Sequence, residues 1–306
     1  MRKLASILFL TLLFCCGAGV ASAAEELSFR RPTRAGDAFQ TEVNLAFTRE
    51  YRFVLAGPDK PVIRQESLSV TLFAWMKVLE VNSVGNPNRV ELRISMIGGY
   101  LDGKAFDASQ LMGKTVFCDM RRLPCRFTYG ESNQRLPREA RRLLGAVFRV
   151  PPENTLKDTL GEGIVPAPGK RWNISALPVM ESLKQRGFEL KGSSIESVAK
   201  IAGKDNFRGI DCWQVTASIL SRDVPNLDFR LKADLWIPAD PKLNVIRTIR
   251  SGVEVVDRML PMDNPLSSGS SVRVITNETM EAILIPAKEE KKTPGKRSSW
   301  SDFILH

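Results

Sequence analysis

The chain has 306 residues and a formal net charge of +10, and its one histidine is the last residue, His306. Because no histidine lies within the body of the chain, the sequence excludes Ser-His-Asp and Cys-His catalysis and zinc sites built from histidine. The excess of basic residues favours anionic partners such as lipid head groups or an anionic envelope component, although solubility alone also explains it. Nucleic acid is not expected, since no nucleic-acid-binding module occurs.

The first 23 residues have the pattern of a secretory signal peptide. Arg2 and Lys3 precede an apolar run over 4–14, and the small residues 21–23 follow. The run is shorter than the roughly 20 residues that span a bilayer. We therefore expect cleavage near Ala23, export to the periplasm or the extracellular space, and a mature chain that is not an integral membrane protein.

A lipoprotein anchor is the alternative interpretation of this segment. Cys15 and Cys16 directly follow the apolar run, where a lipidated cysteine would stand. Lipidation requires a small residue before the cysteine, and Phe14 precedes Cys15. The sequence therefore favours simple cleavage.

Apolar residues that alternate with polar ones indicate antiparallel β-strands along most of the chain. The pattern occurs over 39–55, 68–78, 90–96, 213–219, 229–237 and 272–284. We expect roughly ten strands of this kind, several longer than usual, joined by short turns. The predicted fold is mainly β (α+β), a large curved antiparallel sheet or half-barrel with one or two short helices.

One amphipathic helix is predicted where apolar residues recur at helical spacing over 136–147. Asn133 is expected to cap it and Pro137 to lie in its first turn. Shorter helices are expected over 107–112 and 180–186. The outer side of the main helix carries four candidate contacts for anionic groups: Arg135, Arg138, Arg141 and Arg142.

The chain divides into two β-rich halves, 24–150 and 169–287, joined by a linker over 151–168 that is rich in proline and glycine. Each half opens with a glycine followed three residues later by an aromatic residue. This pattern leaves open both an internal duplication and two similar stretches of meander. The charged tail 288–306 is predicted to be disordered.

Three aromatic residues stand on the polar side of their alternating strands: Phe73, Trp75 and Trp236. Aromatic side chains in such positions line a binding surface or are covered by a helix. We take them as the candidate site for an apolar or amphipathic ligand on the concave face of the sheet.

Three cysteines remain after the expected cleavage. A hairpin centred on residues 121–122 would place Cys118 opposite Cys125, with Cβ atoms about 4.5–5.5 Å apart. That spacing is close to what a disulfide needs, and an oxidising compartment permits the bond. The third cysteine, Cys212, is predicted to be a small buried hydrophobic residue.

Carboxylates provide the remaining catalytic alternative. A glycoside hydrolase needs two acids about 5–10 Å apart. Glu91, Asp234 and Glu254 stand on predicted strands, but each is explained more simply as a charge on a solvated face. The sequence contains no phosphate-binding loop, dinucleotide fingerprint or nucleophile elbow, so no cofactor and no metal is expected.

The hairpin over 233–247 resembles that of the lipoprotein-carrier-like half-barrels of the bacterial envelope and of an uncharacterised secreted family. The residues 169–172 before the second half are similar to the same secreted family. The resemblance covers 35–258 and implies a curved sheet whose concave side is closed by helices and binds acyl chains or another envelope component. It implies no catalytic residue. The chain departs from it after 258, where a further strand is predicted.

These patterns together favour a non-enzymatic envelope protein that acts by binding. A structural or protein-interaction module with a fully packed core is the alternative, and a carboxylate-dependent hydrolase is a third. The oligomeric state and the identity of a ligand do not follow from the sequence.

Overall fold

The computed structural model describes residues 26–29, 31, 33–54, 62–107, 110–130, 132–149, 155–185, 188, 194–221, 224–259 and 270–287. The predicted signal peptide and the predicted disordered tail lie outside the described residues. In the part of the chain that is described, no helix is both long enough and apolar enough to cross a bilayer.

One antiparallel sheet of twelve strands dominates the fold, in the order β6-β5-β3-β2-β1-β12-β11-β10-β9-β8-β7, with β4 paired to β3. The strands are β1 Ala38–Val54, β2 Val62–Val81, β3 Pro87–Leu101, β4 Lys104–Ala105, β5 Thr115–Asp119, β6 Arg126–Tyr129, β7 Arg171–Asn173, β8 Ile195–Phe207, β9 Ile210–Ser221, β10 Leu227–Pro238, β11 Arg247–Met259 and β12 Ser271–Pro286. The helices are α2 Arg138–Val147, α3 Leu156–Leu160 and α4 Leu177–Gln185. The predicted fold class, a curved and open antiparallel sheet with short helices, is confirmed.

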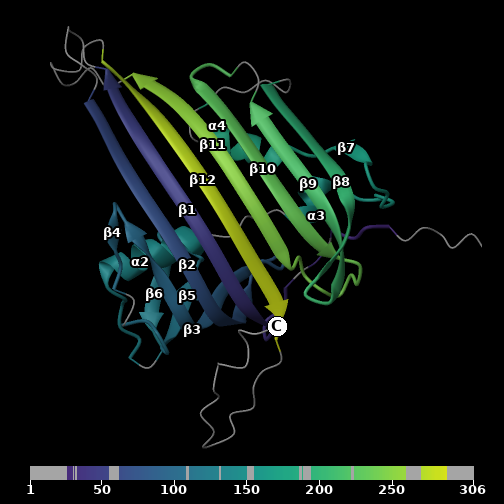
Figure 1. Cartoon of the computed structure of the whole chain (residues 1–306), viewed down its shortest axis with the longest axis horizontal. Helices are drawn as coiled ribbons and strands as arrows, with labels where there is room; N and C mark the ends of the chain where they lie inside the picture. The colour runs from purple at the N-terminus through teal and green to yellow at the C-terminus, as the bar shows by residue number, and fades with distance from the viewer. Residues whose placement is uncertain are drawn as a thin grey trace, which may run out of the picture.

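The sheet curves around its helices. Residues of β1, β2, β3, β5 and β6 form one buried cluster with Leu143 and Leu144 of α2, and β3, β5 and β6 turn behind β2 in Figure 1. Helices α3 and α4 lie on the same side of the sheet as α2, near its other end (Figure 1). We call this helix-bearing side the concave face and the opposite side the convex face.

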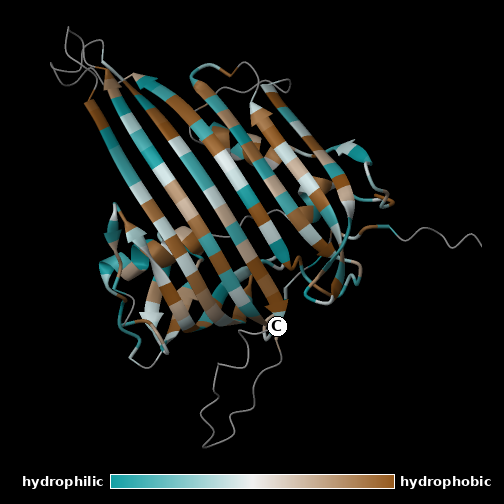
Figure 2. Ribbon diagram, viewed as in Figure 1, coloured by the Kyte–Doolittle hydropathy of each residue, from teal (hydrophilic) through white to brown (hydrophobic). Residues whose placement is uncertain are grey.

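Strand register confirms that one face continues across the whole sheet. Val43 of β1 pairs with Ala282 of β12, which pairs with Thr248 of β11, and Thr248 pairs with Leu235 of β10. Val43 lies in the cluster under α2, whereas Leu235 lies in the cluster that contains Leu160 of α3. A third cluster joins α4 to β10 and β11. Apolar and polar residues alternate along the long strands in Figure 2, as expected for a sheet covered on one face.

The predicted strands are all present, but the local predictions for the helices were partly wrong. The N-cap position of α2 is Pro137, which makes no side-chain cap, and Asn133 lies in a turn with a φ of 54°. The expected helix over 107–112 is absent from the described residues there, since 110–113 form a turn. The expected helix over 180–186 is α4, which begins three residues earlier.

The two predicted halves share one sheet, and in each half the strands follow one another along the sheet in chain order and in the same direction. β1 opens the first half at the centre of the sheet, whereas β7 opens the second half at an edge. The halves meet where β1 pairs with β12, the last strand among the described residues. The predicted linker also contains α3, whose Leu160 is buried in the core. The topology is compatible with both an internal duplication and two similar stretches of meander.

A short segment before β1 packs on the second half of the chain. We call residues 26–29 and 31 the N-terminal strap. Phe29 is 3% exposed and its ring lies 6.3 Å from that of Trp172. The guanidinium of Arg31 donates hydrogen bonds to the carbonyl oxygens of Pro238 at 2.7 Å and Asp240 at 3.0 Å. Burial lowers the pKa of Arg31 to about 10, although the charge of Asp240 opposes this, so Arg31 stays charged at neutral pH.

Candidate functional site

The predicted aromatic site does not lie on the concave face. The register sets Phe73 and Trp75 opposite Glu42 and Gln40 of β1, whereas the alternate residues of β2 enter the cluster under α2. Both aromatic side chains therefore face the convex side, where they are half-buried. The guanidinium of Arg93 lies 4.4 Å from the ring centroid of Trp75. The prediction that these residues line the concave face is wrong.

Trp236 also faces the convex side, but it is covered. It is only 5% exposed, and its Nε1 donates a hydrogen bond to Asp205 Oδ2 at 2.6 Å. The ring of Phe207, at the tip of the β8–β9 hairpin, lies 6.4 Å away, and the guanidinium of Arg247 lies 4.4 Å from the Trp236 ring. The pairing of β8 with β9 shifts register between Ile201 and Gly203, before the tip of the hairpin that covers Trp236. Trp236 therefore does not line an open surface, and its predicted contact with a ligand lacks support.

The turn between β5 and β6 differs from the prediction by two residues. Cys118 pairs with Phe127, and the last pair before the turn is Asp119 with Arg126. Cys125 therefore lies within the turn and not opposite Cys118. Both cysteines are free thiols in the structure, so the geometric basis of the predicted disulfide is wrong.

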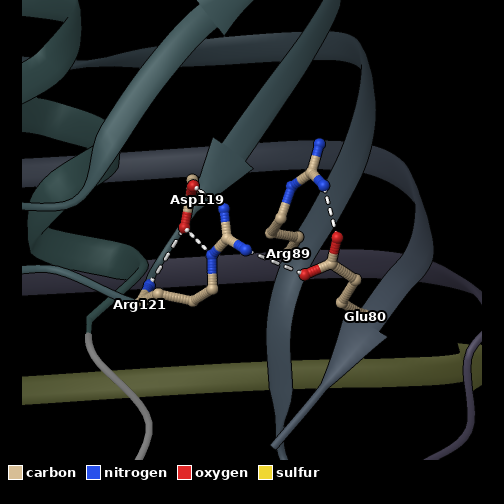
Figure 3. A network of polar contacts seen from close by, with 4 residues as sticks. All are labelled: Glu80, Arg89, Asp119 and Arg121. Carbon is tan, nitrogen blue, oxygen red and sulfur yellow. Dashed lines mark hydrogen bonds and ion pairs between the residues drawn. The ribbon is translucent and has the colours of Figure 1, made fainter.

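A polar network shapes this turn and attaches it to the β2–β3 hairpin (Figure 3). Asp119 accepts hydrogen bonds from the backbone N–H of Arg121 at 3.1 Å and from its side chain at 2.6 Å. The same guanidinium forms an ion pair with Glu80 at 3.2 Å, and Glu80 also pairs with Arg89. Hydrogen bonds from Arg121 lower the pKa of Asp119. These local contacts extend the turn beyond the two-residue form that the sequence suggested.

The three described cysteines differ in burial, and we therefore expect their thiols to differ in reactivity. Burial raises the pKa of the thiols of Cys118 and Cys125, and it raises that of Cys212 to about 11. Cys118 and Cys212 are buried, whereas Cys125 is partly exposed. Because the thiolate is the reactive form, maleimide should label Cys125 first in the native protein, at least about 100-fold faster than Cys118. Peptide mapping after timed labelling measures this order. After denaturation without reductant, all three cysteines should react as free thiols. If two of them did not react, a disulfide would be present and the structure would be contradicted.

The four candidate arginines of the predicted helix are all exposed, as expected. Leu136, Ala140, Leu143 and Leu144 are buried on the inner side of α2. On the outer side, Arg142 Nη2 lies 3.4 Å from Asp102 Oδ2. The contact of Arg135, Arg138, Arg141 and Arg142 with an anionic partner stays a prediction.

The three candidate carboxylates are not brought together. Glu91 lies on β3 and Asp234 on β10, both on the convex face, with β2, β1, β12 and β11 between them. At roughly 4.8 Å per strand their separation is about 24 Å, well beyond a hydrolase pair. Glu254 faces the concave side, because it pairs with Phe229 of the core. The described residues also contain no group of acidic, cysteine or histidine side chains that could hold a metal ion.

Sequence reasoning missed a set of charged residues on the concave face. Arg49 of β1, Arg250 of β11 and Glu278 of β12 all point to this side, between the cores that α2 and α4 cover. Arg149, two residues after the end of α2, reaches the same place. We call these four residues the arginine strip. A signal was present for two of them, since Arg49 and Glu278 each interrupt the apolar side of an alternating strand.

Glu278 is the centre of the arginine strip. Its side chain is 17% exposed, and it forms ion pairs with Arg149 at 2.7 Å and with Arg250. Burial alone would raise the pKa of Glu278, but hydrogen bonds and charge from Arg149 and Arg250 outweigh it, so the pKa is lowered. Gly252 stands opposite Glu278 on β11 and adds no side chain beside it. The carboxylate is therefore held ionised between two guanidinium groups.

The arginine strip is open to solvent and has apolar neighbours. The side chains of Arg149 and Arg250 are 51% and 42% exposed. Arg250 Nη2 lies 3.6 Å from the sulfur of Met280, and the guanidinium of Arg49 lies 5.0 Å from the ring centroid of Phe47. Each guanidinium has five N–H donors, so two arginines that share one carboxylate keep donors for a second anion. The arrangement can therefore bind an anionic group beside apolar surface.

Two shallow depressions of about 290 Å³ each are found among the described residues. One lies by Lys114 and Tyr129 near the β6 edge. The other crosses β2, β1, β12 and β11, where its lining includes the exposed Asn44 and Ala46 of the convex face. Both are open, and each is at the lower limit of the volume that ligand pockets usually have, about 300–1,000 Å³.

Comparisons with known proteins found similarity only among solved structures. No family model and no curated relative matches the chain. Among solved structures, a DUF1329 family protein from Desulfovibrio piger is similar, with 10% identity, a TM-score of 0.14, and coverage of 78% of this chain and 84% of that chain. We base no inference on a likeness at this TM-score. The resemblance to lipoprotein carriers stays a prediction.

Proposed function

We propose that the chain is an exported envelope protein that acts by binding an amphipathic ligand with an anionic head group, without catalysing a reaction. The head group would bind at the arginine strip, and the apolar chain would lie along neighbouring apolar side chains of the concave face. The proposed ligand site therefore consists of other residues than the aromatic residues predicted from the sequence.

The observation that carries the proposal is the pairing of Arg149 and Arg250 on Glu278 at a position that is still open to solvent. Hydrogen bonds from arginine to a carboxylate or a phosphate are among the strongest that proteins form. Phe47 and Met280 provide apolar surface directly beside the charges. An amphiphile matches both kinds of surface, whereas a small inorganic anion matches only one.

Oleate tests the proposal, with oleyl alcohol as the uncharged control of equal chain length. Calorimetry should show that the protein binds oleate more tightly than the alcohol. Arg149→Gln and Arg250→Gln should each lower oleate affinity about tenfold, because each removes a charge-assisted hydrogen bond. Glu278→Gln should raise oleate affinity, because it frees both guanidinium groups from a competing carboxylate.

The matched control is Arg230→Gln, which removes an exposed charge from the convex face of β10. This variant should bind oleate as the wild type does. Equal affinity for oleate and oleyl alcohol, or equal loss in the control, would exclude the arginine strip as the head-group site.

A structural or protein-interaction module is the second candidate. Three buried clusters fill the concave face beneath α2, α3 and α4, and the depressions found are small. A module of this kind would bind neither oleate nor the alcohol, and native mass spectrometry of the purified protein would find no bound amphiphile.

A further inference from the structure

The outer side of α2 carries a concentrated positive charge that the arginine strip does not use. Arg138, Arg141 and Arg142 are all exposed, and Arg135 precedes them by about one helical turn. Positions three and four apart lie on one face of a helix, so these side chains share one surface. Asp102 contacts Arg142 from the β3–β4 turn. The arginines therefore form one basic surface, which we call the α2 basic face.

This charge is unfavourable for the helix itself. Arg138 and Arg141 lie in the N-terminal turns of α2, where the helix dipole favours negative charge, and Glu139 is the acidic residue of the first turn. Like charges at a spacing of three or four residues also repel each other. Pro137 at the N-cap position provides no side-chain cap to offset these effects. An anionic partner would relieve both kinds of repulsion.

The inner side of α2 limits what that partner can be. Leu143 and Leu144 are fully buried against the sheet, so the apolar side of the helix is already occupied. The helix cannot insert this side into a bilayer without unfolding the core. Contact through the α2 basic face is therefore electrostatic and confined to the surface.

We propose that the α2 basic face docks the protein on the surface of a bilayer that contains anionic lipids. A planar charged surface can contact Arg138, Arg141 and Arg142 at once, because they share one side of α2. The inference rests on the proposed function in one respect: a bilayer is the natural source of an amphipathic ligand. Docking itself does not require the arginine strip.

Vesicle co-sedimentation of the mature chain tests the docking. Vesicles of phosphatidylcholine with phosphatidylglycerol should bind the protein, vesicles of phosphatidylcholine alone should not, and high salt should abolish the binding. The variant R138Q/R141Q/R142Q should bind on the order of 100-fold more weakly, since each basic residue near an anionic surface contributes roughly fivefold. Its thermal unfolding temperature should equal or slightly exceed that of the wild type, because the exposed substitutions remove like-charge repulsion from the helix.

The matched control is K200Q/R230Q/K242Q, which removes three exposed charges from the second half of the chain. It should bind vesicles as the wild type does. Equal loss in the control would overturn the proposal in favour of an effect of net charge, as would equal binding to neutral vesicles. Binding to soluble polyphosphate without binding to vesicles would also overturn it.

Two further variants separate this proposal from the oleate site. Arg149→Gln should lose oleate affinity and keep vesicle binding, whereas the α2 variant should do the opposite. If the protein binds vesicles but not oleate, the proposed oleate site is wrong and the proposed docking on a bilayer still holds.

Discussion

Gly99→Ala is expected to destabilise the protein by at least about 3 kcal/mol. A Cβ atom on Gly99 would lie 2.1 Å from the carbonyl oxygen of Ser69 and 3.0 Å from its carbonyl carbon. Both atoms belong to the backbone of β2, which pairs with β3 at this point. No side-chain rotation can relieve the contact, so the two strands must separate locally. Val70 and Leu72 on the same stretch of β2 are core residues under α2, so the damage would spread into the core.

Gly98→Ala is the matched control for this prediction. It makes the same chemical change one residue earlier, where a Cβ atom would meet nothing within 4 Å. We expect its stability to be unchanged or slightly higher, because alanine reduces the entropy of the unfolded chain. Urea unfolding followed by tryptophan fluorescence measures both variants. Similar stabilities for the two would show that β2 and β3 do not approach as the structure has them.

Phe29→Ala is expected to lower the free energy of unfolding by about 3–5 kcal/mol, as for other buried aromatic residues. Phe29 belongs to the N-terminal strap and packs in the same cluster as Leu160 and Ile237 of the second half. The substitution removes the ring that stacks on Trp172. Its effect should therefore appear in the second half, although residue 29 comes before every strand.

Hydrogen exchange locates this effect. In Phe29→Ala, amides of β8, β9 and β10 should exchange faster, while those of β3 and β5 change less. Glu26→Ala changes an exposed residue of the same strap and serves as the control. A uniform loss of protection, or an effect confined to the first half, would contradict the position of the strap.

Alternation along the chain was sufficient to predict the strands and the fold class, and helical spacing of apolar residues predicted the inner and outer sides of the main helix. It divides the residues of each strand into two sets, such as Leu72 and Trp75, but it does not say which set faces the helices. That assignment depends on long-range packing, which is why the aromatic site was placed on the wrong face. Trp236 was misjudged for a related reason, because a hairpin distant in sequence covers it.

The arginine strip could not be predicted from the sequence, for a different physical reason. Arg49 and Glu278 are more than 200 residues apart in sequence, and they become neighbours because β1 pairs with β12. A single charge such as Arg49 or Glu278 on the apolar side of one strand looks like an irregularity in the sequence. It becomes part of a site only when pairing of the strands brings the charges together. The prediction for the turn at Cys125 was wrong at short range, because the pairing of β5 with β6 already ends at Asp119 and Arg126.

The central position of β1 also has a consequence for folding kinetics. β1 pairs with β2 at once, but its other edge pairs with β12, the last of the described strands in the chain. The pair of Phe39 with Pro286 joins the first and the last of these strands. Contacts of such long sequence separation form slowly. Throughout synthesis, a strand of 17 residues would present an unpaired edge, and open edges of this length promote aggregation. We therefore expect refolding to be limited by closure of this central seam and its yield to fall as protein concentration rises.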